Sequence, residues 1–222
     1  MRIPLIEPYS EGAPEETIYL PKEVYERDPL LLTNDKEKTR FIKSVEKMVR
    51  GSYEYKEYIS YLIKTQEMNV CSAFPGLSKE LVRTIKLEIH HEPFTLYDIV
   101  FLIYTRFLNE GRKINVYTLA DETLRTHFRG RVGLLPLSKT VHELVHVGKV
   151  FLPLQYLDDG FLEFFKDYKL EIENSPLKGV LEKKLEISKT FNFKSNSVLQ
   201  KKYIYINAED YDNMVQPFDL TR

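Results

Sequence analysis

Four of the five histidines in the chain fall in two short clusters, and histidine is well suited to binding a transition metal or moving a proton. The first cluster is the pair His90-His91, and the second is His142 with His146 in the run His-Glu-Leu-Val-His. Residues at i and i+4 share one helix face, so His142 and His146 can converge on one ion. Successive strand side chains point to opposite sides, so one member of the pair can bind that ion while the other accepts a proton. The two clusters predict a three-histidine metal site with a neighbouring base.

Three elements must position these clusters. Residues Val82 to Ile89 alternate between apolar and polar in a way that favours a strand, which His90-His91 ends. Residues Arg131 to Leu137 form a second short apolar strand. Ser138 then caps the helix that carries His142 and His146, and Gly148 ends that helix. The sequence therefore predicts two strands and a short helix around one ion.

The remaining segments predict a largely helical surround. Apolar spacing and capping residues predict helices over Asn34–Arg50, Tyr53–Gln66, Leu96–Leu108, Val116–His127 and Asp159–Tyr168. Two further strands are predicted, a buried one at Val150–Leu154 and another at Lys202–Asn207. In the second helix, Tyr58, Tyr61 and Leu62 are expected on the inner face.

The predicted fold class is α+β, in three consecutive segments. Residues 1–70 form an N-terminal helical region, 71–155 form the core with its inserted helices, and 156–222 form a C-terminal α/β extension. A length of 222 residues suits one domain with an appended part. We expect the three segments to make one compact unit.

Composition limits the compartment and the class of partner. Cys71 is the only cysteine, which excludes an intrachain disulfide and a cysteine-rich zinc site and suits a reducing compartment. The apolar run Ile99 to Tyr104 is far too short to cross a bilayer, and Met1 to Gly12 lacks a signal-peptide core. We expect a cytoplasmic protein with no membrane partner. The net charge of −1 gives no global attraction to nucleic acid, so any such binding must use local patches.

The histidine pattern resembles the metal site of HNH nucleases, most closely the colicin-type DNases. The resemblance rests on Leu-Glu-Ile-His-His from Leu87 and on the run from Leu134 to Gly148, and it covers roughly residues 80 to 150. It implies a ββα-metal core in which His90, His142 and His146 bind one divalent transition metal. Zinc is the expected ion, with nickel and manganese as alternatives. The amino-acid sequence also resembles proteins of tailed phages, and this resemblance implies a location in the cytoplasm of the host cell.

The resemblance implies metal-assisted hydrolysis of phosphodiester bonds in nucleic acid, with DNA favoured as the partner. His91 would be the general base that takes a proton from the attacking water. Four cations flank the predicted site and are expected to hold backbone phosphates: Arg129, Arg131, Lys139 and Lys149.

The sequence departs from the HNH pattern in two places. The family's middle Asn, about nine residues before the first helical histidine, falls on Gly133 here. The helices predicted between Leu96 and His127 must also be an insertion between the two histidine clusters. These departures keep open a second hypothesis, an HNH-like domain that has lost catalysis and serves a structural or nucleic-acid-binding role.

A third hypothesis takes His142 to His146 alone as the H-E-x-x-H motif of zinc proteases. Glu143 would then be the general base, and Glu163 is the nearby carboxylate at a plausible distance for a third ligand. The short helix that Gly148 ends and the unexplained His90-His91 pair count against this hypothesis.

Overall fold

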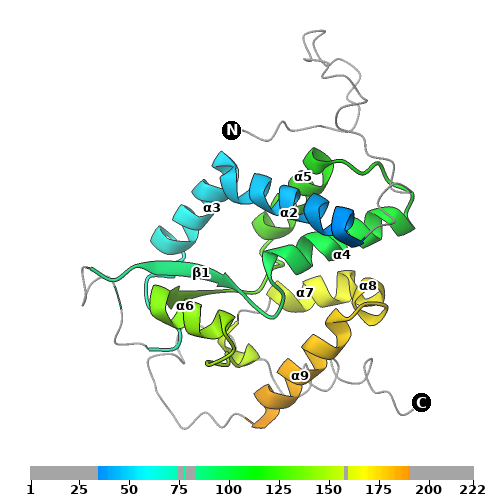
Figure 1. The fold of residues 1–222 in the computed structure, drawn as a ribbon. Helices are drawn as coiled ribbons and strands as arrows, with labels where there is room; N and C mark the ends of the chain where they lie inside the picture. Colours follow the sequence, from blue (N-terminus) through cyan, green and yellow to red (C-terminus); the bar gives the residue numbers. More distant parts are fainter. Residues whose placement is uncertain (1–34, 75–77, 79–83, 158–159, 191–222) are drawn as a thin grey trace. The chain divides into compact units, whose positions relative to one another are not determined.

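The structure is a computed structural model that describes residues 35–74, 78, 84–157 and 160–190 (Figure 1). These residues are mostly helical and contain one two-stranded antiparallel sheet, which confirms the predicted α+β class. The elements in chain order are α2 (Asp35–Gly51), α3 (Tyr53–Lys64), β1 (Leu87–His91), α4 (Leu96–Asn109), α5 (Val116–Phe128), β2 (Leu134–Ser138), α6 (Lys139–His146), the 3₁₀ helix η2 (Leu154–Tyr156), α7 (Gly160–Asp167), α8 (Lys169–Glu173) and α9 (Leu177–Thr190). The strand predicted at 202–207 and the first residues of the one predicted from Val82 lie outside the described residues.

The contacts divide the chain into two compact units, each built from two separate stretches. The first unit combines the stretch that ends at Glu57 with Leu96–Phe128. The second combines Tyr58–Thr95 with the stretch that begins at Arg129. The helices predicted as an insertion, α4 and α5, therefore pack with the N-terminal helix α2 in one unit, while both histidine clusters belong to the other.

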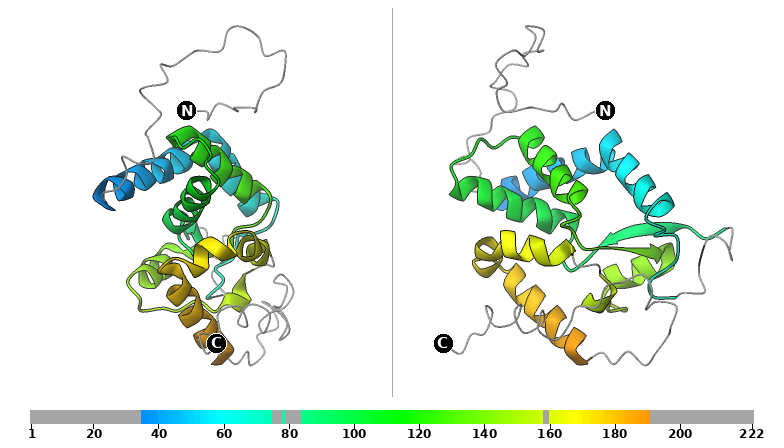
Figure 2. Two further views of the ribbon diagram at one scale, coloured as in Figure 1. Left: turned by 90° about the vertical axis from the view of Figure 1, so that its right-hand side faces the viewer. Right: turned by 180° about the vertical axis from the view of Figure 1, so that it is seen from behind.

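The first unit is a packing of α2, α4 and α5 (Figure 2). Helix α2 buries an apolar face made of Phe41, Ile42, Val45 and Val49. Phe41 packs edge-on against Tyr104 of α4, with ring centroids 6.2 Å apart. This spacing of apolar residues is the helical period from which α2 was predicted.

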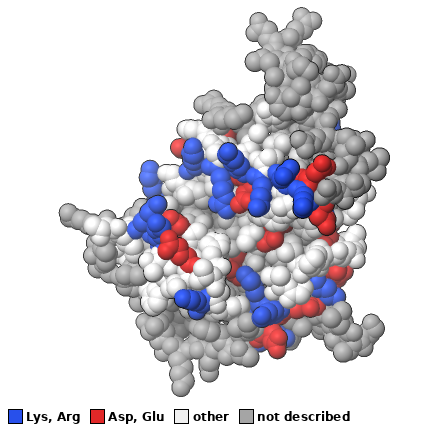
Figure 3. All heavy atoms as spheres, in the orientation of Figure 1, with Lys and Arg blue, Asp and Glu red and all other residues white. Residues whose placement is uncertain are grey.

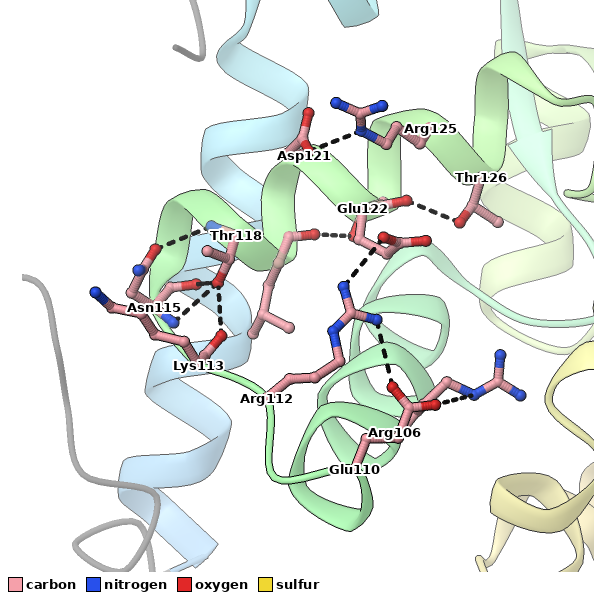
Figure 4. A network of polar contacts seen from close by, with 12 residues as sticks. Arg106, Glu110, Arg112, Lys113, Asn115, Thr118, Asp121, Glu122, Arg125 and Thr126 are labelled. Atoms are coloured by element: carbon pink, nitrogen blue, oxygen red, sulfur yellow. Dashed lines mark hydrogen bonds and ion pairs between the residues drawn. The ribbon is translucent and has the colours of Figure 1, made fainter. Parts of the chain in front are cut away.

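The turn between α4 and α5 is fixed by polar contacts (Figure 4). The Asn115 side chain accepts hydrogen bonds from the backbone N–H groups of Tyr117 and Thr118, both at 2.9 Å, and so satisfies free donors at the start of α5. Arg112 of the turn forms ion pairs with Glu110, just after α4, at 3.4 Å and with Glu122 of α5 at 3.5 Å. The turn is thereby specified by side chains as well as by its backbone.

His127 belongs to the core of the first unit and to no cluster. It is fully buried near the end of α5, where its Nδ1–H donates to the carbonyl of Thr123 at 2.6 Å. The ring of Tyr55 packs edge-on against it at 5.7 Å between centroids. Burial lowers the pKa of His127 to about 4, so the ring is neutral in the folded chain at neutral pH.

The second unit is organised around the antiparallel pair β1–β2, and α6 packs against both strands. The register sets Leu87 opposite Ser138 and His91 opposite Leu134. Because β2 ends at Ser138 and α6 begins at Lys139, strand and helix follow each other without a loop. Within this unit, β1, β2 and α6 follow one another as strand, strand and helix, as predicted.

The C-terminal elements of the second unit are helical in the residues described here. Helices α7, α8 and α9 follow one another, and α9 packs against η2. Phe94 lies among the rings of Phe164 and Phe165, at 6.3 and 5.6 Å between centroids. These aromatic contacts join the end of the β1 segment to α7.

Two sequence predictions in this unit are wrong. Val150–Leu154 is buried at Leu152 and Leu154, as expected, but it is not a strand. The Val150 N–H donates back to the Leu144 carbonyl at the end of α6, and Pro153 has no N–H to give to a ladder. Tyr61, expected on the inner face of α3, is 47% exposed.

In the described part of the chain, no helix is long and apolar enough to cross a membrane.

Candidate metal centre

Three histidine side chains converge at the junction of β1, β2 and α6. One ring nitrogen from each of His90, His142 and His146 lies within 4.8 Å of the other two. The Nε2 atoms of His142 and His146 are 3.0 Å apart. The ring of His90 packs edge-on against both, at 5.0 and 5.3 Å between centroids. These three residues, called the three-histidine group below, are the ones that the sequence predicted as metal ligands.

Local structure explains why the three rings meet. The Ser138 side chain accepts a hydrogen bond from the Val141 N–H and starts α6 directly after β2. One helical turn then separates His142 from His146 on the same face. His90 lies opposite Leu135 in the ladder, and so next to the strand from which α6 departs. The backbone N–H of Ser138 also donates to the buried thiol of Cys71 at 3.3 Å, which fixes the start of α6 from another segment.

Glu88 holds the ring of His142. The Nδ1–H of His142 donates to the Glu88 carboxylate at 2.6 Å. Because a carboxylate only accepts, the proton of a neutral His142 must sit on Nδ1, which leaves the lone pair of Nε2 directed at the group. This hydrogen bond holds the pKa of Glu88 below its ordinary value. A carboxylate behind a histidine ring in this way fixes its tautomer and raises its basicity as a ligand.

Glu92 is the carboxylate that contacts the ring of His90, as Glu88 contacts that of His142. Its carboxylate lies 3.3 Å from the Nε2 of His90, and both side chains are buried. The Lys184 ammonium of α9 forms an ion pair with the other oxygen of Glu92. A buried carboxylate needs such partners, because an isolated charge in the interior is costly. The rings of His142 and His90 therefore each have a carboxylate partner.

Neither carboxylate was predicted, although the sequence contains the signal for both. Glu88, His90 and Glu92 alternate along one extended segment, so their side chains point to the same side of the strand. Acidic residues two positions before and after a ligating histidine are well placed to contact it. The ion pair of Lys184 with Glu92, by contrast, joins residues 92 positions apart, and no local sequence pattern indicates it.

His91, the predicted general base, is separate from the three-histidine group. It follows His90 on β1 and is not one of the three converging histidines, and strand alternation places its side chain on the face opposite to that of His90. The side chain is buried, with 5% exposed.

Gly133 is the residue at which the HNH pattern would have its middle Asn, and its surroundings leave no space for a side chain. A Cβ atom there would lie 2.0 Å from the carbonyl oxygen of Glu92 and 3.1 Å from the Leu157 side chain. The Gly133 carbonyl in turn accepts a hydrogen bond from the Glu92 N–H at 3.0 Å, one step beyond the last pair of the β1–β2 ladder. The absence of the Asn is therefore built into the backbone geometry of this chain.

The four predicted phosphate-binding cations differ in their surroundings. Arg131 forms an ion pair with Asp167 of α7, and Lys139 forms one with Glu143 at 3.7 Å. Arg129 and Lys149 are exposed. Arg129 and Lys149 are therefore the better placed of the four to meet a phosphate, since neither has an ion pair among the described residues.

The residues that the protease hypothesis needs do not join the group. Glu143 is exposed on the outer face of α6 and pairs with Lys139. Glu163 lies on the surface of α7, where the hydrogen bond and charge of Lys166, 2.7 Å away, lower its pKa. The third histidine beside His142 and His146 is His90, from the cluster that the protease hypothesis leaves unexplained.

Comparison with known proteins gives a family for the chain. The model of the bacteriophage G278-like virion protein family matches residues 16–212, which is most of the chain. No match was found among curated proteins or among solved structures. The chain therefore belongs to the bacteriophage G278-like virion protein family.

Proposed function

We propose that this member of a phage virion protein family is a metal-dependent endonuclease of the HNH type that hydrolyses phosphodiester bonds in DNA. One observation carries the proposal: three histidines from a strand and a helix converge in a strand–strand–helix unit. His91 follows His90 on β1 and is the residue to which the resemblance to HNH nucleases gives the part of general base. Membership of a virion protein family implies no enzymatic activity, so the support for a nuclease comes from the three-histidine group.

The donor set fits a divalent ion of a first-row transition metal, with zinc expected and nickel or manganese as alternatives. Neutral imidazole nitrogens suit such ions and suit magnesium poorly. Glu88 already directs the Nε2 lone pair of His142 at the group. The short Nε2–Nε2 contact between His142 and His146 is of the size expected for two ligands of one ion, each at about 2.0–2.1 Å from it. A three-histidine set leaves a fourth position for water or substrate.

When bound, the ion would neutralise charge on the scissile phosphate and on the departing oxygen. The residues of the chain supply the rest. Glu88 and Glu92 orient the rings of His142 and His90 and hold them in place. His91 accepts the proton of the attacking water at a ring nitrogen, and Arg129 with Lys149 holds the DNA backbone.

A second candidate function is an HNH-like domain that binds DNA without cutting it. Two observations favour it. Gly133 leaves no room for the Asn that steadies the base in HNH nucleases, and the His91 side chain is buried. In this alternative the ion would serve stability and the particle would gain a DNA-binding component.

Nicking of supercoiled plasmid DNA separates these functions. The nuclease proposal expects metal-dependent nicking by the wild-type chain and loss of nicking in His91→Ala with the metal retained. Glu143→Gln is the matched control, because a protease would need this carboxylate and the nuclease would not. Metal binding without nicking in the wild type would refute the nuclease and support the binding-only domain.

A further inference from the structure

A row of basic side chains runs along the outer face of α2 in the first unit. Its members recur at steps of four and three residues, which places them on one helix face. All are exposed, and they lie opposite the apolar face of α2. This row, called the basic stripe below, consists of Lys36, Arg40, Lys43, Lys47 and Arg50.

The charge of the basic stripe is largely uncompensated at its centre. Arg50 pairs with Glu46 at 3.0 Å. The three central cations, Arg40, Lys43 and Lys47, have no ion pair with any residue that the structure describes. Figure 3 shows lysine and arginine side chains gathered over α2 on the face in view. A net charge of −1 for the whole chain makes this concentration of positive charge local.

The dimensions and surroundings of the stripe favour one class of partner. At about 1.5 Å per residue, the stripe is roughly 21 Å long, a length over which duplex DNA presents a continuous row of phosphates. A membrane-surface helix would need a free apolar face, whereas Phe41, Ile42, Val45 and Val49 of α2 are buried in the unit. Lysine and arginine side chains such as those of the stripe commonly contact phosphates, and phosphate contacts hold a duplex without reading its sequence.

We infer that the basic stripe of α2 is a binding surface for the phosphate backbone of duplex DNA, separate from the three-histidine group. Binding here requires neither metal nor His91, so the inference does not depend on the proposed cleavage. The role inferred for the first unit is to bind DNA independently of its sequence.

The test is the salt dependence of duplex binding in EDTA, followed by fluorescence anisotropy of a labelled duplex of about 20 base pairs. We expect the triple variant Arg40→Gln, Lys43→Gln, Lys47→Gln to bind more weakly. Its slope of log K against log salt should be shallower by about 2.7, at about 0.9 per lost phosphate contact. Glutamine has nearly the helix propensity of lysine and arginine, so α2 is retained.

A matched control removes the same charge elsewhere. Lys166→Gln, Lys169→Gln, Lys183→Gln changes three exposed lysines of the second unit and should leave the slope unchanged. Equal slopes for the stripe variant and the wild type, or equal losses in both triple variants, would overturn the inference. So would a wild type that polyglutamate displaces from DNA as well as unlabelled duplex does at equal charge concentration, because the stripe would then suit acidic proteins.

Discussion

His127, the buried histidine of the first unit, makes the free energy of unfolding depend on pH. His127 has its pKa lowered from 6.5 to about 4, first by burial and then by the nearby charge of Arg50, although its hydrogen bond to Thr123 acts in the opposite direction. As pH falls, the unfolded chain therefore takes up this proton before the folded chain does. The stabilising contribution is complete above the unfolded value of 6.5 and is lost as pH falls from there towards 4.

The size of the loss follows from the two pKa values of His127. At pH 5 the unfolded ring is protonated and the folded ring is still mostly neutral, which costs about 2 kcal/mol relative to pH 8. At pH 4 the cost approaches about 3 kcal/mol. The ring is fully buried, so solvent does not screen this effect.

The perturbation is His127→Gln, which removes the titration and keeps an N–H donor for the Thr123 carbonyl. The assay is urea unfolding followed by circular dichroism at pH 8 and pH 5, because the chain has no tryptophan. EDTA in all samples keeps bound metal from contributing. We expect the wild type to lose about 2 kcal/mol more than the variant between the two pH values. The other histidines are common to both proteins, so equal losses would refute the reasoning.

Three further predictions concern the second unit. Glu88→Gln should weaken zinc binding about 10- to 100-fold in a competition titration, whereas Glu143→Gln should leave it unchanged. Equal zinc affinities of the two variants would show that Glu88 does not support metal binding. Gly133→Ala should lower the free energy of unfolding by about 3 kcal/mol, since its Cβ would meet the Glu92 carbonyl. Gly179→Ala in α9 should instead raise the free energy of unfolding by about 0.5–1 kcal/mol, because its Cβ meets nothing within 4 Å and alanine favours a helix. A similar loss of stability in both glycine variants would contradict this contrast.

The sequence predicted the elements that carry the histidines because their signals are local. Ser138 and Gly148 mark the ends of α6, and Gly148 has the positive φ of 71° that favours glycine after a helix. The convergence of His90 with His142 and His146 required one non-local inference, which the resemblance to HNH nucleases supplied. The structure brings the three rings together with the β1–β2 register as the physical link.

Other features depend on packing that no local pattern encodes. Lys184 reaches Glu92 across 92 residues of sequence, and α9 gives no sign of that contact. The grouping of α2 with α4 and α5 depends on complementary apolar faces, such as those that join Phe41 and Tyr104. Val150–Leu154 satisfied the apolar criterion for a buried strand, but burial alone does not distinguish a strand from a buried coil.

The most direct test of the proposed site is the metal content per chain, measured by elemental analysis of purified wild type, His90→Ala, His142→Ala and His91→Ala. We expect about one transition-metal ion per chain in the wild type and in His91→Ala, and none in His90→Ala or His142→Ala. Circular dichroism of each variant in EDTA controls for folding. A wild type that contains no metal and does not take up zinc, or a His90→Ala variant that keeps its ion, would contradict the convergence of the two histidine clusters on one metal.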